Sequence, residues 1–137
     1  MSNVGPGVRP HLTVNGADAA IDFYVKALGA KEIHERVRAD DGKRLLHGEM
    51  LIHGTVVYIC DDFPEFCGGK SRDPKKLGGT PIRLHQCVPN CDEAVNRAAA
   101  AGATVVGPPS DMFWGDRYGV IEDPFGYEWS FSHPLAK

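Results

Sequence analysis

The chain has 137 residues, a formal net charge of −3 at pH 7, and 42% hydrophobic and 24% charged residues, which is typical of one globular domain. It has no basic stripe and no apolar run near the roughly 18 residues of a membrane helix, so we expect neither a nucleic-acid partner nor a membrane partner. The first ten residues lack a signal-peptide core, which predicts a cytoplasmic protein whose four cysteines are free thiols.

The first half of the chain predicts one helix among several strands. The expected elements are a strand over 8–14, a helix over 17–28, a strand over 31–38, and a hairpin of strands over 43–52 and 55–61. The helix has apolar residues at helical spacing, starts near Asn15 or Asp18, and ends at Gly29. The dipeptide His53-Gly54 is the expected hairpin turn.

The second half predicts the same order after a linker over 62–80 that is rich in glycine, proline and charge. The expected elements are a strand over 81–88, a helix over 91–101, a short strand over 103–106, a proline-rich loop over 107–112, and strands near 117–122 and 126–132. A capping box at Asn90 starts the helix, and Gly102 ends it.

The two halves also repeat each other in sequence. Arg9 and His11 recur at a constant offset as Arg83 and His85, and the helix starts DAAI and DEAV recur at the same offset. One repeat of this length indicates a duplicated supersecondary unit. We therefore expect an α+β fold in a single domain, 1–137. Its two βαβββ modules span about 8–61 and about 81–133 and form a curved, partly open, barrel-like sheet with helices on the outside.

Strand alternation turns a set of polar side chains to one face. Leu12 and Val14 are expected to pack under the helices, so Arg9 and His11 point the other way. If the polar faces of the two modules curl around each other, they enclose a pocket, which is the default binding-site hypothesis. The candidates for its lining are Arg9, His11, His47, Glu49, Tyr58, Arg83, His85, Glu128 and Ser130.

Two longer motifs carry a family resemblance. Residues 18–30, DAAIDFYVKALGA, and residues 113–129, FWGDRYGVIEDPFGYEW, resemble the glyoxalase/bleomycin-resistance/extradiol-dioxygenase (vicinal oxygen chelate) superfamily, and within it the PhnB-like branch. The resemblance implies paired βαβββ modules, which agrees with the internal repeat. It also implies a homodimer.

The resemblance further implies a metal site in catalytic members, with a histidine from the first strand and a glutamate from the last strand of each module. In this chain these positions fall on Arg9, Tyr58, Arg83 and Ser130. Arginine stays protonated and has no lone pair for a metal, so we expect no metal at the usual positions. The alternative is a displaced zinc, nickel, manganese or iron site built from His11, His85, Glu49 and Glu128.

Three functions remain open, and whether the protein is an enzyme stays open with them. The preferred one is a protein that binds a small anionic or carbonyl-bearing molecule between the modules without a cofactor. Its binding residues would be Arg9, Arg83, Tyr58, Trp114, Tyr118 and Ser130. The second is a metal-dependent lyase or isomerase of the glyoxalase type with Glu49 or Glu128 as base. The third is a metal-free enzyme that uses His47 and Glu49 as acid and base.

Overall fold

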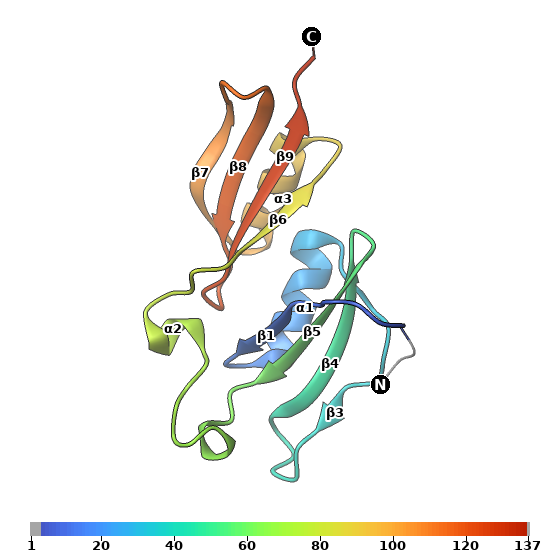
Figure 1. Cartoon of the computed structure of the whole chain (residues 1–137), viewed down its shortest axis with the longest axis vertical. Coiled ribbons are helices and arrows are strands. Elements are labelled where there is room, and N and C mark those ends of the chain that lie inside the picture. Colours follow the sequence, from blue (N-terminus) through green and yellow to red (C-terminus); the bar gives the residue numbers. More distant parts are fainter. Residues whose placement is uncertain (1–3, 137) are drawn as a thin grey trace.

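The structure, a computed structural model, describes residues 4–136 and contains two sheets (Figure 1). The first module comprises β1 (His11–Val14), α1 (Ala17–Leu28), β2 (Lys31–Glu32), β3 (Val37–Arg38), β4 (Leu45–Ile52) and β5 (Thr55–Asp61). Its five-stranded sheet has the order β1-β5-β4-β2, and β3 also pairs with β4. β1 runs parallel to β5, whereas β4 is antiparallel to each of its neighbours.

The second module repeats this order after a connecting segment. The segment contains a 3₁₀ turn at Pro64–Phe66 and the short helix α2 (Pro74–Leu77). The module then comprises β6 (Arg83–Cys87), α3 (Cys91–Ala101), β7 (Thr104–Asp111), β8 (Asp116–Glu122) and β9 (Glu128–Pro134). Its four-stranded sheet has the order β6-β9-β8-β7, and β6 runs parallel to β9. The predicted α+β class with two modules is confirmed.

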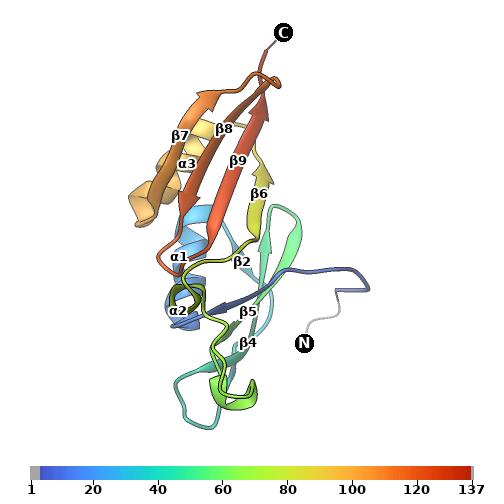
Figure 2. The ribbon, with the colours of Figure 1, turned by 60° about the vertical axis from the view of Figure 1, so that its left-hand side comes forward.

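The two modules lie end to end along the long axis, and neither sheet closes into a barrel (Figure 1). α1 packs on the first sheet, α3 packs on the second, and the two helices contact each other. Figure 2 shows both helices on one side of the molecule. Among residues 4–136, no helix is long and apolar enough to cross a membrane.

The start of α1 depends on a carboxylate that is distant in sequence. α1 spans Ala17–Leu28 as predicted, and its N-cap is Gly16 in a left-handed conformation, between Asn15 and Asp18. Asp61, at the end of β5, accepts hydrogen bonds from the amides of Gly16 (2.7 Å) and Ala17 (2.9 Å) on one oxygen, and from Leu45 N on the other (2.8 Å). This buried carboxylate replaces a local cap and joins α1 to β4 and β5.

A second buried carboxylate connects the two modules. Asp123, in the turn before β9, is 2% exposed. One of its oxygens accepts from the amides of Phe125 (2.8 Å) and Tyr127 (3.0 Å). The other accepts from the hydroxyl of Tyr24 on α1 (2.5 Å) and from Trp129 Nε1 on β9 (2.8 Å). Burial and the adjacent carboxylate raise the pKa of Tyr24, so its hydroxyl stays a donor.

Two strands of the first module are shorter than predicted. The strand expected over 8–14 begins only at His11. The strand expected over 31–38 consists of β2 and β3, which are two residues each and pair with different parts of β4. Alternation therefore does not govern the side chains before His11 or those between β2 and β3.

The prediction of a proline-rich loop over 107–112 is also wrong. β7 continues to Asp111 and passes through Pro108 and Pro109. It is an edge strand that pairs only with β8, and its register shifts on both sides of Gly107. An edge strand with such irregularities tolerates proline because no second neighbour needs the missing amide.

Candidate functional site

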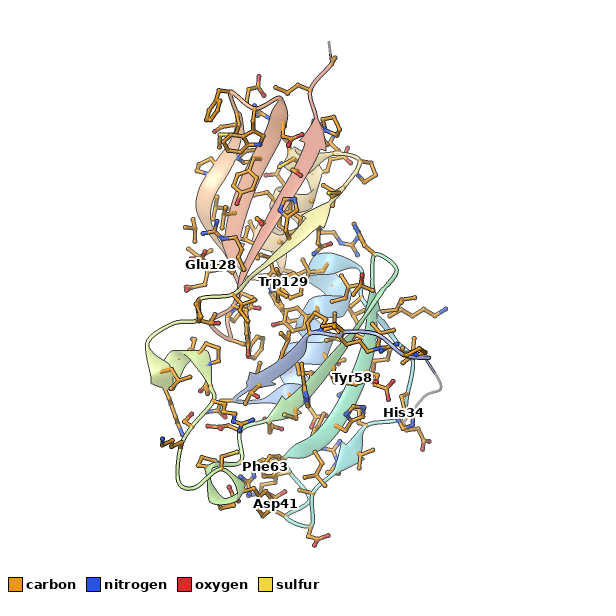
Figure 3. The ribbon with its side chains drawn as sticks, viewed as in Figure 1. His34, Asp41, Tyr58, Phe63, Glu128 and Trp129 are labelled. Atoms are coloured by element: carbon orange, nitrogen blue, oxygen red, sulfur yellow. The ribbon has the colours of Figure 1, made fainter. Side chains whose placement is uncertain are left out.

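The residues that the sequence singles out divide between the two modules. Those on the first sheet are His11, His47, Glu49 and Tyr58. Those on the second module are Arg83, His85, Trp114, Tyr118, Glu128 and Ser130. Figure 3 shows the separation, with Tyr58 in the lower sheet and Glu128 in the upper module.

On the first sheet, three strands bring four of these side chains together. Tyr58 on β5 lies opposite His11 on β1 and opposite Glu49 on β4. His47 and Glu49 share one face of β4, as alternation predicts, and His47 Nε2 lies 2.9 Å from Glu49 Oε2. The ring of Tyr58 lies 4.8 Å from that of His47 and 5.9 Å from that of His11. The result is one compact polar cluster.

The acid–base pair of this cluster is buried. Glu49 is 1% exposed and His47 is 8% exposed. A carboxylate at this depth is stable only with hydrogen-bond partners, and His47 is one of them. A buried imidazole–carboxylate pair is suited to accepting and returning a proton.

His34 also belongs to the cluster, although no sequence pattern selects it. Its ring lies 6.3 Å from that of His47. It lies between β2 and β3, where the chain is not a strand, so alternation could not assign it to either face.

His11 is a neutral imidazole at the edge of the cluster. Burial, followed by the charges of His47 and Arg72, lowers the pKa of His11 below its ordinary value. Within residues 4–136 its ring has aromatic neighbours and no hydrogen-bond partner. Both ring nitrogens are therefore available to a ligand, one as donor and one as acceptor.

A cavity of about 370 Å³ opens beside His11. Its lining comes from β1, β5, the connecting segment and the turn before β9: His11, Thr13, Cys60, Asp61, Asp62, Phe63, Cys67, Arg72 and Tyr127. The Thr13 hydroxyl lies 3.8 Å from Cys60 Sγ, and burial raises the pKa of the Cys60 thiol. Thr13 and Cys60 are therefore neutral polar groups of the wall, and Asp61, Asp62 and Arg72 are its charged groups.

Asp62 holds the connecting segment, which forms part of the cavity lining, in place through hydrogen bonds. The Asp62 carboxylate accepts hydrogen bonds from Ser71 Oγ (2.5 Å) and from the amide of Arg72 (3.1 Å). The sequence predicts this segment only as a linker, and no pattern in it marks Arg72 as a site residue. Glycine, proline and charge signal a loop but not the side to which its side chains turn.

On the second sheet, the predicted anion-binding arginine is already paired. Arg83 donates to Glu128 Oε1 through Nε (3.1 Å) and Nη2 (2.9 Å), and to the Tyr118 hydroxyl through Nη1 (3.1 Å). The pair lies on an exposed part of the sheet. An anion binding to Arg83 would have to compete with Glu128.

His85 is similarly occupied. Its Nδ1 lies 2.8 Å from Ser130 Oγ, and its Nε2 lies 2.9 Å from Ser132 Oγ. Its ring stacks on that of Tyr118 at 5.9 Å, and the Trp114 ring packs edge-on against the Tyr118 ring at 6.0 Å. The repeat-related residues His11 and His85 thus differ, because only His85 has hydrogen-bond partners for both nitrogens.

Arg9 does not reach a shared pocket as predicted. It precedes β1, and its guanidinium donates to the backbone carbonyls of Val4, Gly5 and Gly7 at 2.7–3.1 Å. These bonds use Nη1 and Nη2, whereas the buried Nε has no hydrogen-bond partner among residues 4–136, so Arg9 stabilises the segment before β1.

The residues at the usual metal positions do not fit a divalent metal. Arg9 and Arg83 are cationic donors, and Ser130 is bonded to His85. The displaced set is split, with His11 and Glu49 on the first sheet and His85 and Glu128 on the second. Over the described part of the chain, no three His, Cys, Asp or Glu side chains lie close enough to hold a metal ion.

A second cavity, of about 290 Å³, lies between the modules. It is lined by Pro10, Ile52, His53, Thr55, Val57, Leu84, His85, Gln86, Cys87 and Trp129. Among the predicted site residues it includes only His85. The residues of the polar cluster on the first sheet do not line this cavity.

The chain is similar to known proteins over almost its whole length. Residues 8–131 match the protein-family model described as the glyoxalase/bleomycin resistance protein/dioxygenase superfamily. The uncharacterized proteins Mb0911c of Mycobacterium bovis and Rv0887c of Mycobacterium tuberculosis are each 51% identical to it over 135 residues. These alignments cover 98% of this chain and 88% and 78% of those proteins.

Solved structures share the fold at lower identity. A gene product from Arabidopsis thaliana is 26% identical with a TM-score of 0.71, and the alignment covers 94% of this chain and 99% of that one. TioX from Micromonospora sp. ML1 is 24% identical with a TM-score of 0.68, over 96% and 98% of the two chains. A PhnB protein from Bacillus cereus is 12% identical with a TM-score of 0.66, over 93% and 99%.

Proposed function

The chain belongs to the glyoxalase/bleomycin resistance protein/dioxygenase superfamily, and from that premise we propose that it binds a small anionic or carbonyl-bearing molecule on its first sheet. The ligand would occupy the cavity beside His11, whose ring joins this cavity to the polar cluster of His47, Glu49 and Tyr58. The motifs at 18–30 and 113–129 support a place in the PhnB-like branch.

One observation carries this proposal: the cavity adjoins a neutral histidine with no hydrogen-bond partner among residues 4–136. Ligand sites are concave and contain a few polar groups whose bonding capacity is left for the ligand. His11 meets this condition, whereas the nitrogens of His85 are occupied by two serines. The first sheet is therefore favoured over the second.

A second candidate function is metal-free proton transfer at the same site. The buried His47–Glu49 pair favours it, since an imidazole bonded to a carboxylate at 2.9 Å is suited to accepting a proton. The neutral imidazole of His11 would then donate a hydrogen bond to a ligand carbonyl oxygen. This arrangement is suited to removing a proton next to a carbonyl group.

The internal repeat supplies a matched test of the binding site. Wild type, His11→Asn and His85→Asn would be screened by ligand-observed NMR against small carboxylates and carbonyl compounds, including pyruvate and methyl pyruvate. We expect His11→Asn to weaken the hits about 10-fold or more, because the ligand loses an imidazole partner, and His85→Asn to leave them unchanged. Weakening only in His85→Asn would refute the assignment, provided that circular dichroism shows both variants folded.

A further inference from the structure

We propose that Arg72 is the anion-binding residue of the first-sheet cavity and that the ligand is a small monocarboxylate. This inference rests on the proposed function, and it names the ligand class and a residue that determines specificity. It replaces Arg9 and Arg83, the arginines that the repeat had suggested for this role.

Arg72 differs from every other arginine in the chain. All eight arginines lie within residues 4–136, and seven of them donate side-chain hydrogen bonds: Arg9, Arg36, Arg38, Arg44, Arg83, Arg97 and Arg117. Among residues 4–136, the guanidinium of Arg72 has no hydrogen-bond acceptor. Arg72 lines the cavity, and a guanidinium without an acceptor is complementary to a carboxylate, which accepts two parallel hydrogen bonds.

The backbone holds Arg72 at the cavity. Its amide donates to Asp62, whose other oxygen accepts from Ser71 Oγ. On the other side, Asp73 is 3% exposed and caps α2 by accepting from Lys75 N at 3.1 Å. Arg72 therefore extends from a fixed point of the chain, which lowers the entropy lost when its side chain is ordered by a ligand.

The two aspartates in the lining favour a small ligand that carries a single negative charge. Asp61 uses its oxygens on three backbone amides, and Asp62 accepts from Ser71 and from the Arg72 amide. Neither pairs with the Arg72 guanidinium, but both keep a negative charge in the wall of the cavity. Their repulsion would oppose a dianion such as phosphate more strongly than a monocarboxylate.

The rest of the lining suits the other end of such a ligand. His11 lines the same cavity, and the Arg72 charge is one of the causes that keep its imidazole neutral. With its carboxylate on Arg72, a 2-oxo acid would present its carbonyl oxygen toward the His11 side of the cavity. The thiol of Cys60 is protonated, so it would not repel the anion.

The test uses pyruvate, methyl pyruvate and inorganic phosphate, with binding followed through the His11 ring signals by NMR. In wild type we expect pyruvate to bind at least about 10-fold more tightly than its neutral ester or phosphate. Arg72→Gln should lose about 10-fold or more in pyruvate affinity and leave the ester unchanged. Lys70→Gln, which removes a neighbouring exposed charge outside the lining, should behave as wild type.

The outcomes separate this inference from the proposed function. Equal pyruvate affinity in wild type and Arg72→Gln, or tighter binding of the ester, would overturn the role of Arg72 and leave the site intact. His11 signals that respond to none of the probes would overturn both. Without any ligand, Arg72→Gln should also raise the pKa of His11, because a nearby positive charge is removed; an unchanged pKa would contradict the proximity of the two groups.

Discussion

Replacement of Asp123 by alanine is expected to lower the free energy of unfolding by about 3 kcal/mol, measured by urea denaturation. The physical reason is that four donors lose their acceptor in a site that is 2% exposed. These donors are the amides of Phe125 and Tyr127, the hydroxyl of Tyr24 and the indole of Trp129. An unsatisfied buried donor costs its full desolvation energy.

Tyr24→Phe is the matched control for this prediction. It removes one donor, keeps the ring that packs against Trp129, and should cost only about 1 kcal/mol. A loss below about 1 kcal/mol in Asp123→Ala, or an equal loss in the two variants, would show that Asp123 is not the hub of this network.

Glu49→Gln is expected to slow exchange of the pyruvate methyl protons with D₂O by about 10²–10⁴-fold, the usual contribution of a positioned base. The amide keeps the size of the side chain but carries no charge, so it cannot stabilise a proton taken up by the His47–Glu49 pair. Exchange is read by proton NMR, with the uncatalysed rate in buffer subtracted.

Glu128→Gln is the control, because it removes a carboxylate of the second sheet that pairs with Arg83 and lies outside the proposed site. It should exchange the pyruvate protons at the wild-type rate. Wild type that does not exceed buffer, or Glu49→Gln that matches wild type, would leave binding as the only function of the site.

The elements that were predicted well have strong local signals. α1 shows helical spacing and a glycine stop, and α3 has an Asn90 side chain that accepts from Glu93 N, as the capping box predicts. His47 and Glu49 could be placed on one face because they are two residues apart in a long strand. The repeat then supplied the order of the second module.

The parts that failed depend on contacts between distant residues. Arg9 was assigned by extending β1 to residue 8, but the backbone carbonyls before the strand bind its guanidinium instead. Arg72 was missed because its position is set by Asp62, ten residues earlier, and a loop has no periodicity that assigns a face. Asp61 likewise caps α1 from the far end of the module.

The two copies of the Arg-x-His motif therefore differ in their hydrogen bonding. In the second module, Arg83 and His85 are bonded to their own sheet through Glu128, Ser130 and Ser132. In the first module, His11 keeps both nitrogens for a ligand, with no hydrogen-bond partner in the region from residue 4 to residue 136. Only the first copy of the motif therefore leaves a histidine for the proposed ligand.

Amide chemical-shift mapping of the ¹⁵N-labelled protein during titration with pyruvate decides most directly where the ligand binds. We expect the saturable shift changes to fall on 11–13, 58–60 and Arg72, which surround the first-sheet cavity. Changes confined to 83–87 and 128–132 would place the ligand on the second sheet and contradict the assignment made from His11.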